Sequence, residues 1–225
     1  MSSGIRSCRP TAARGALAAG LAAALALAGC SVVMGSKKAV EGGQSPPVYR
    51  VGDSLTFEEQ GEETAIFVTA VEDDQLTWTD NAGNKWVTSR DPMIPPRAEM
   101  PKSGGPSVLR FFEPQSPTVF PLAPNKKVQY TVTVSRTGEQ PRFERQSCEE
   151  HAPHPLTVEA GTFDAWEIVC RRGGVRETLY YAPAVGAVLL RQRETPKGVE
   201  RVTLADFHRA QTNGEAAGGA ASAKA

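Results

Sequence analysis

The clearest pattern in the chain is an alternation of apolar and polar residues between about positions 49 and 207. In Lys127–Val134, three valines and a tyrosine fall on one face, and a glutamine and two threonines fall on the other. This period of two is typical of an antiparallel strand with one buried face. Similar patterns predict further strands at Leu55–Glu59, Thr64–Val71, Leu76–Thr79, Lys85–Ser89, Arg142–Cys148, Leu156–Glu159, Ala165–Arg171, Arg176–Tyr181, Ala187–Arg193 and Glu200–Leu204.

Turn-forming residues separate these segments, as in Asp80–Asn84, Ala160–Thr162 and Arg172–Gly174. Outside the first 29 residues, no stretch keeps a helical period over three turns. The pattern therefore predicts an all-β fold, built as an antiparallel curved sheet, a sandwich or an open barrel.

A proline-rich segment divides the predicted strands. Residues 91–124 contain nine prolines, which cannot donate to a β-ladder, so we expect a loop, an edge or an extended crossing there. Its apolar runs Val108–Phe112 and Val119–Leu122 suggest that it packs along the sheet. The expected organisation is a four-strand N-terminal lobe (49–90), this crossing (91–124) and a C-terminal sheet (125–207). One shared core and two separate lobes are both compatible with the pattern.

The N-terminus has the pattern of an export signal. Arg6, Arg9 and Arg14 are followed by the apolar run Gly15–Gly29, which is shorter than the roughly 20 residues that a membrane-spanning helix needs. The run ends in Leu27-Ala28-Gly29-Cys30, which resembles the lipobox of bacterial lipoprotein signals. The resemblance implies a signal peptide at 1–29, cleavage before Cys30 and lipidation of that cysteine. An ordinary secretory signal or a short anchor is the alternative.

The residues beside the folded region suggest a tether and a tail. Residues 30–48 are rich in Gly, Ser, Lys and Pro, and we expect a flexible tether; residues 208–225 are expected to be a disordered tail. A residue other than Asp after the lipidated cysteine, here Ser31, implies by the same resemblance an outer-membrane destination. We therefore expect a lipid-anchored protein of the cell envelope, on the periplasmic face of the outer membrane.

The charge balance restricts the partners. The chain has 25 basic and 25 acidic residues, and loss of the three signal arginines would leave 22 basic residues and a net charge of −3. A broadly basic nucleic-acid-binding surface is excluded, and no strong attraction to anionic lipid is expected. Acyl chains on Cys30 are the expected membrane contact. An envelope protein or an apolar ligand is a further expected partner.

Two cysteines, Cys148 and Cys170, lie in the predicted folded region. Export places them in an oxidising compartment, so we expect them to form a disulfide. Two reduced buried thiols are the alternative, and the lack of a Cys-x-x-Cys spacing argues against a catalytic pair.

Other candidate chemistry is weak. The segment Cys148–His154 holds a cysteine, two glutamates and two histidines, but prolines interrupt it, and we interpret His151 and His154 as solvated loop residues. The acidic runs at 58–63 and 72–74 lack a calcium-loop pattern, and we interpret them as strand ends and a turn. Gly-x-Ser-x-Gly and phosphate-binding glycine motifs are missing from the sequence. We expect no catalytic residue, no metal and no cofactor.

Aromatic residues leave one further possibility. Trp166 shares a strand face with Ile168 and Cys170, which predicts a core position. The tryptophans at 78 and 86 fit either a core or an apolar cavity for a lipid-like ligand, because a curved sheet can enclose one.

The segments Leu156–Cys170 and Glu177–Gly186 resemble uncharacterised exported β-rich bacterial proteins, with an Ala-Gly-Thr-Phe turn and a Tyr-Ala-Pro-x-x-Gly motif. The resemblance implies two hairpins turning at Gly161 and Gly186, and no catalytic residue. We therefore expect a non-catalytic binding or assembly module. The alternatives are a carrier of a lipid-like ligand in a β cavity and an envelope hydrolase. A cavity enclosed by the sheet would favour the carrier.

Overall fold

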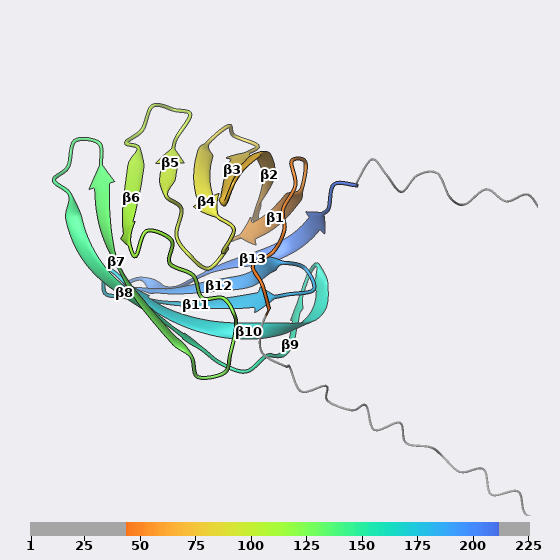
Figure 1. Ribbon diagram of the computed structural model, residues 1–225. Helices are drawn as coiled ribbons and strands as arrows, with labels where there is room; N and C mark the ends of the chain where they lie inside the picture. The colour runs from red at the N-terminus through yellow and green to blue at the C-terminus, as the bar shows by residue number, and fades with distance from the viewer. Residues whose placement is uncertain (1–43, 212–225) are drawn as a thin grey trace, which may run out of the picture. The chain divides into compact units, whose positions relative to one another are not determined.

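The computed structural model describes residues 44–211, and within this range it contains thirteen strands and no helix (Figure 1). The signal peptide 1–29, Cys30 and parts of the expected tether and tail lie outside the described residues. Within residues 44–211 there is no helix long and apolar enough to cross a membrane. The strands are β1 (Ser54–Glu59), β2 (Glu62–Glu72), β3 (Gln75–Asp80), β4 (Lys85–Ser89), β5 (Ala98–Met100), β6 (Val108–Glu113), β7 (Lys127–Arg136), β8 (Arg142–Glu150), β9 (His154–Val158), β10 (Gly161–Arg172), β11 (Val175–Ala182), β12 (Ala187–Thr195) and β13 (Gly198–His208).

These strands form one antiparallel sheet that closes on itself. The order is β11-β12-β13-β1-β2-β3-β4-β5-β6-β7-β8-β10-β9, and β10 also pairs with β11. The sheet is therefore a closed ring of twelve strands, and β9 pairs only with β10 (Figure 1). The predicted all-β fold is confirmed, and the sheet closes rather than remaining open.

All eleven strands expected from the alternation are present. The proline-rich segment, expected to be a loop, an edge or an extended crossing, contains two further strands. Residues 91–124 contribute β5 and β6, and β6 pairs with β7 along its whole length, from Val108 opposite Arg136 to Glu113 opposite Thr131. Pro106 and Pro114 lie just outside β6, so they do not remove a donor from the ladder.

The two halves of the described chain share one sheet. β1 pairs with β13, which places Leu55 opposite Phe207, so the N-terminal strands do not form a separate lobe. One buried cluster combines Leu55 and Trp78 from the first four strands with Leu189 and Leu204 from the last two. The shared core is therefore the arrangement that the structure adopts.

The loops of the proline-rich segment pack against the inward face of the sheet. Met93, Val119 and Leu122 are fully buried in a cluster that includes the inward-facing Val132 and Ile168. The buried carboxylate of Asp91 fixes these loops. It accepts hydrogen bonds from the backbone amides of Met93 and Val119, at 2.9 and 2.7 Å, and from the hydroxyl of Thr118, at 2.8 Å. The segment fills part of a lumen too wide for strand side chains alone.

The two hairpins implied by the C-terminal resemblance are present. β9 and β10 meet at Gly161, and β11 and β12 meet beside Gly186, which has a φ of 71°. At Gly186, an added Cβ would lie 2.7 Å from a guanidinium nitrogen of Arg209 and 3.0 Å from Pro47. The positive φ and the close neighbours both favour glycine there.

Candidate ligand-binding site

The structure joins Cys148 and Cys170 by a disulfide between directly opposed residues of β8 and β10, whose Cα atoms lie 4.0 Å apart. The Cys148 sulfur therefore cannot serve as a metal ligand. The ring of His154 packs edge-on against Tyr180, with ring centroids 5.7 Å apart. Within residues 44–211, no three His, Cys, Asp or Glu side chains converge as a metal site would require.

The acidic runs lie where turns were expected. Glu58 and Glu59 end β1, the next pair of glutamates begins β2, and Glu58 accepts a hydrogen bond from the Gly61 amide in the turn between them. Asp73 and Asp74 form the turn between β2 and β3. These carboxylates are therefore parts of hairpins.

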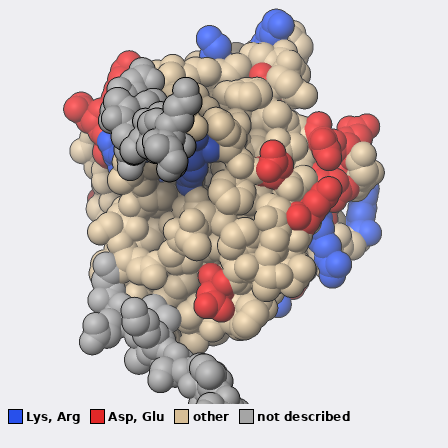
Figure 2. All heavy atoms as spheres, turned by 90° about the vertical axis from the view of Figure 1, so that its right-hand side faces the viewer, with Lys and Arg blue, Asp and Glu red and all other residues tan. Residues whose placement is uncertain are grey.

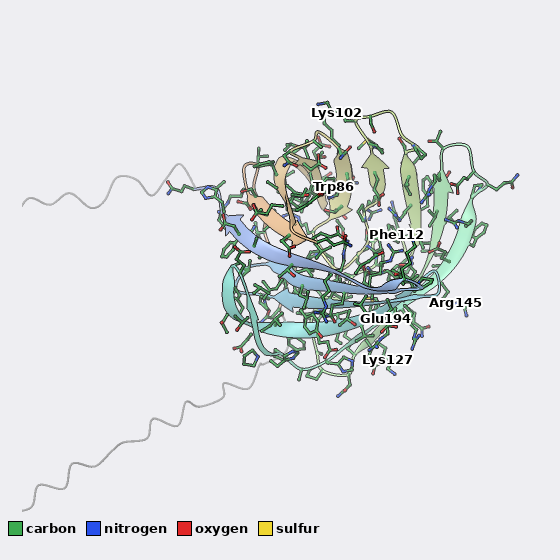
Figure 3. The ribbon with its side chains drawn as sticks, turned by 180° about the vertical axis from the view of Figure 1, so that it is seen from behind. Trp86, Lys102, Phe112, Lys127, Arg145 and Glu194 are labelled. Atoms are coloured by element: carbon green, nitrogen blue, oxygen red, sulfur yellow. A yellow bond between two sulfur atoms is a disulfide. The ribbon has the colours of Figure 1, made fainter. Side chains whose placement is uncertain are left out.

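The lumen contains an apolar pocket of about 270 Å³ between β1–β4 on one side and β11–β13 on the other. Trp78 and Trp86, directly opposite each other on β3 and β4, contribute two of its walls, and Figure 3 shows Trp86 among the strands. The remaining walls are largely aliphatic and aromatic: Tyr49, Leu55, Phe57, Ile66, Leu76, Pro92, Leu179, Ala187, Val188 and Val202. The sequence was compatible with either a core or a cavity position for Trp78 and Trp86, and the structure places both in the wall of a cavity.

Hydrogen bonds and ring contacts hold the pocket wall in place. The indole NH of Trp78 donates to the hydroxyl of Thr88 at 3.0 Å. Tyr49 packs edge-on against Trp78, with centroids 5.1 Å apart, and donates its hydroxyl to the Gly186 carbonyl at 2.5 Å. Burial raises the pKa of Tyr49, so this hydroxyl stays protonated. By contrast, Trp166 is 1% exposed and belongs to the packed core, as its strand pattern predicted.

A second hollow of about 590 Å³, here called the arginine chamber, lies at the end of the lumen where β7 and β8 and also β10 and β11 are joined by turns. Its wall contains six arginines and three glutamates, a formal excess of three positive charges. The arginines are Arg110, Arg136, Arg142, Arg172, Arg191 and Arg193, and the glutamates are Glu99, Glu144 and Glu177. The neutral balance of the whole chain therefore conceals a chamber with an excess of positive charge.

The deeper arginines of the chamber are paired. Arg110 contacts Glu99 at 2.6 Å, and Arg172 forms an ion pair with Glu177 and donates to the Met93 carbonyl. The side chains of Arg110 and Arg172 are 17% and 16% exposed. Arg191, which is half exposed, reaches Glu177 at 4.0 Å. These pairs offset the desolvation of the deeper charges.

The chamber and the apolar pocket are neighbours, because Pro92, Leu179 and Arg191 line both. One continuous ligand can therefore touch an apolar wall and a cationic wall. Small-molecule sites usually have volumes of roughly 300–1,000 Å³. The chamber falls within that range, and the apolar pocket falls just below it.

Sequence reasoning missed the arginine chamber because exposed apolar residues flank its charged residues on two strands. On β6, Arg110 faces the lumen, while Leu109 and Phe111 face outward and are 45% and 62% exposed. On β8, Arg142 faces the lumen and Phe143 is 78% exposed. The only sequence signal for the chamber was that Arg110 and Arg142 each have apolar neighbours in the sequence. Alternation alone does not show which face of a strand lies inside the ring.

The outer face shown in Figure 2 does not share the cationic character of the arginine chamber. On the face shown in Figure 2, acidic side chains gather along one edge beside a few basic ones, and the rest is largely uncharged. A third hollow lies on the outside of β7, β8, β10 and β11 and has mixed charge, with Lys127, Arg171 and Arg176 beside Glu149 and Glu194. The arginine chamber therefore carries a larger excess of positive charge than this outer hollow.

Comparisons with known proteins found similar folds at low identity. No protein-family description matches the chain, and no curated protein does. The hypothetical lipoprotein YmcC from Escherichia coli is 11% identical, with a TM-score of 0.47 over 69% of this chain and 84% of that one. A Bacteroides fragilis protein thought to be exported, with a YmcC-like fold, is 11% identical, with a TM-score of 0.39 over 72% and 97%. A Parabacteroides distasonis protein thought to be a lipoprotein is 12% identical, with a TM-score of 0.36 over 71% and 96%.

Proposed function

We propose that this protein is a non-catalytic, lipid-anchored envelope lipoprotein that holds a lipid-like ligand in the lumen of its sheet. The observation that carries this proposal is the apolar pocket lined by Trp78 and Trp86, which opens beside the arginine chamber. Of the two binding functions considered from the sequence, the carrier is the one that requires such a cavity.

The proposal combines this lumen with the lipobox-like residues at the N-terminus. Cleavage before Cys30 and acylation of its sulfur would hold the domain at a membrane surface, on the periplasmic face of the outer membrane. The ligand would then be taken up or released close to the bilayer. The apolar wall supplies the burial energy for an acyl chain, at about 0.8 kcal/mol for each buried methylene.

No part of the proposed function requires a covalent bond to form or break. The cysteine with candidate metal neighbours is used in the disulfide, and the buried carboxylate of Asp91 accepts structural hydrogen bonds. The residues that line the apolar pocket are suited to contact and not to proton transfer. We therefore propose a binding protein and not an enzyme.

The test uses monolauroylglycerol, a neutral probe that has an acyl chain and no charge. Its binding should change the fluorescence of Trp78 and Trp86, because both tryptophans line the pocket. Val202→Phe should fill the pocket and weaken binding about tenfold, which corresponds to about 1.4 kcal/mol. Val199→Phe is the matched control, since Val199 lies on the same strand and is 56% exposed. Binding that is absent, or equal in both variants, would refute the proposed function.

A further inference from the structure

Two arginines of the chamber, Arg142 and Arg193, form no ion pair within residues 44–211, although Arg193 lies opposite Glu177 and Glu200 in the sheet. Arg142 begins β8 and Arg193 lies near the end of β12; both side chains are exposed and line the chamber. The ion pairs and side-chain hydrogen bonds of residues 44–211 include neither residue. The deeper Arg110 and Arg172, in contrast, have glutamate partners. The deeper arginines of the chamber are therefore paired with glutamates, whereas these two exposed arginines are not.

Three residues that line the chamber also have buried polar atoms without partners within residues 44–211. Gln146 is 3% exposed and lines the chamber; its amide NH₂ donates to Glu144 at 3.2 Å, while its carbonyl oxygen has no partner within residues 44–211. The Nε atoms of Arg136 and Arg172 are likewise buried and unpartnered in the described part of the chain. Most buried polar groups in proteins have a partner, so these three atoms suggest a bound group.

We infer that the arginine chamber binds the oxyanion head group, a phosphate or a carboxylate, of an amphiphile whose acyl chain occupies the apolar pocket. This inference rests on the proposed function and specifies its ligand. A guanidinium group binds either oxyanion through two parallel hydrogen bonds, and Arg142 and Arg193 are free to do so. Arg191, which lines both hollows, would lie where the head group meets the chain.

The acceptor atoms of the chamber favour a head group that also carries hydroxyls. The carbonyl oxygen of Gln146 can only accept, and the Glu144 carboxylate beside it is also an acceptor. In a glycerol phosphate head group, a hydroxyl would donate a hydrogen bond to the carbonyl oxygen of Gln146, and the phosphate oxygens would accept hydrogen bonds from the arginines. The arrangement therefore suits a phosphorylated or carboxylated polyol lipid better than a bare fatty acid.

The experiment compares four probes on the purified domain by isothermal titration. These are lauroyl lysophosphatidic acid, lauric acid, monolauroylglycerol and glycerol phosphate, which separate the charge from the acyl chain. We expect both charged lipids to bind at least about tenfold more tightly than monolauroylglycerol, because hydrogen bonds to ionised groups are the stronger class. The advantage should decrease as salt is added, because Arg142 and Arg193 are exposed.

Two matched double variants each remove two positive charges, one pair from the arginine chamber and the other pair from the outer surface of the sheet. Arg142→Gln with Arg193→Gln should abolish the advantage of the charged lipids and leave monolauroylglycerol binding unchanged. Arg145→Gln with Arg201→Gln is the control. Arg145 alternates outward on β8, at the periphery in Figure 3, and Arg201 is exposed on β13, so both should retain full binding.

The outcomes separate this inference from the proposed function. Equal binding of charged and neutral lipids, or equal losses in the two double variants, would overturn the anion site while leaving the acyl pocket. Glycerol phosphate binding that depends on Arg142 and Arg193, without lipid binding, would support the anion site and overturn the acyl pocket. Failure of all four probes would overturn both.

Discussion

The disulfide between Cys148 and Cys170 should contribute about 3 kcal/mol to the free energy of unfolding. The two cysteines are separated by 22 residues, and the chain-entropy relation for a closed loop of that length gives this value at 25 °C. Both residues are at most 1% exposed, so reduced thiols would stay within the same packed core. Reduction therefore removes the crosslink and leaves the side-chain volume in place.

The native sheet should survive without the crosslink. β8 and β10 remain joined by the residue pairs on either side, from Glu150 opposite Ile168 to Ser147 opposite Arg171, and β10 is also paired with β11. The loss should therefore come from a less restricted unfolded chain. A loss of about 3 kcal/mol is still a large share of the roughly 5–15 kcal/mol that is typical of a folded domain.

The assay is urea unfolding of oxidised and reduced protein, with reduction carried out in denaturant before refolding. Peptide mass mapping without reductant should show the 148–170 crosslink. The reduced protein should unfold at a lower urea concentration and with a steeper denaturant dependence, because its unfolded chain exposes more surface. Cys148→Ala with Cys170→Ala is the control, since its melt should not respond to reductant. Oxidised and reduced proteins that unfold with the same free energy would refute the reasoning.

Two further predictions concern the anchor and a buried acid. Cys30→Ser should abolish labelling by a fatty-acid analogue and block cleavage before that residue in a bacterial host; labelling that persists would contradict the lipobox interpretation. Burial raises the pKa of Asp91 above its ordinary value of 3.8, so the native state holds the carboxyl proton more tightly than the unfolded state does. The stability that Asp91 contributes therefore falls as the pH rises from 3.8 towards the raised pKa. The destabilisation caused by Asp91→Asn should therefore be greatest below pH 3.8 and decrease above it in denaturant melts, and a pH-independent difference would contradict the assignment.

The sequence was sufficient for most strands because alternation reports directly on a sheet with two different faces. Lys127–Val134 is the clearest case, and β7 differs from the prediction only by extending to Arg136. β5 and β6 were missed because prolines surround them, although Pro106 and Pro114 lie beyond the strand that they flank. Proline density showed where loops occur, but it did not show which residues between the prolines pair.

The candidate site was predictable only in part. Trp78 and Trp86 were recognised as core or cavity residues, and choosing between these required the closure of the sheet, which depends on the long-range pairing of β1 with β13 and of β10 with β11. Arg142, Arg191 and Arg193 lie on strands that the alternation predicted, whereas Arg110 lies on β6, which was missed. Their inward orientation follows from the ring as a whole and not from any local pattern.

The closed ring explains how a chamber with an excess of positive charge is compatible with a stable fold. A ring of eight strands can be filled by side chains, whereas twelve strands enclose more space, and here the loops held by Asp91 fill only part of it. Charges in the remaining space are tolerated in two ways: Arg110 and Arg172 are paired where water is scarce, and the exposed Arg142 and Arg193 stay hydrated. Because the two exposed arginines make no ion pair within residues 44–211, their replacement by glutamine should leave the folded sheet intact. A loss of ligand affinity in that variant would then report on binding and not on folding.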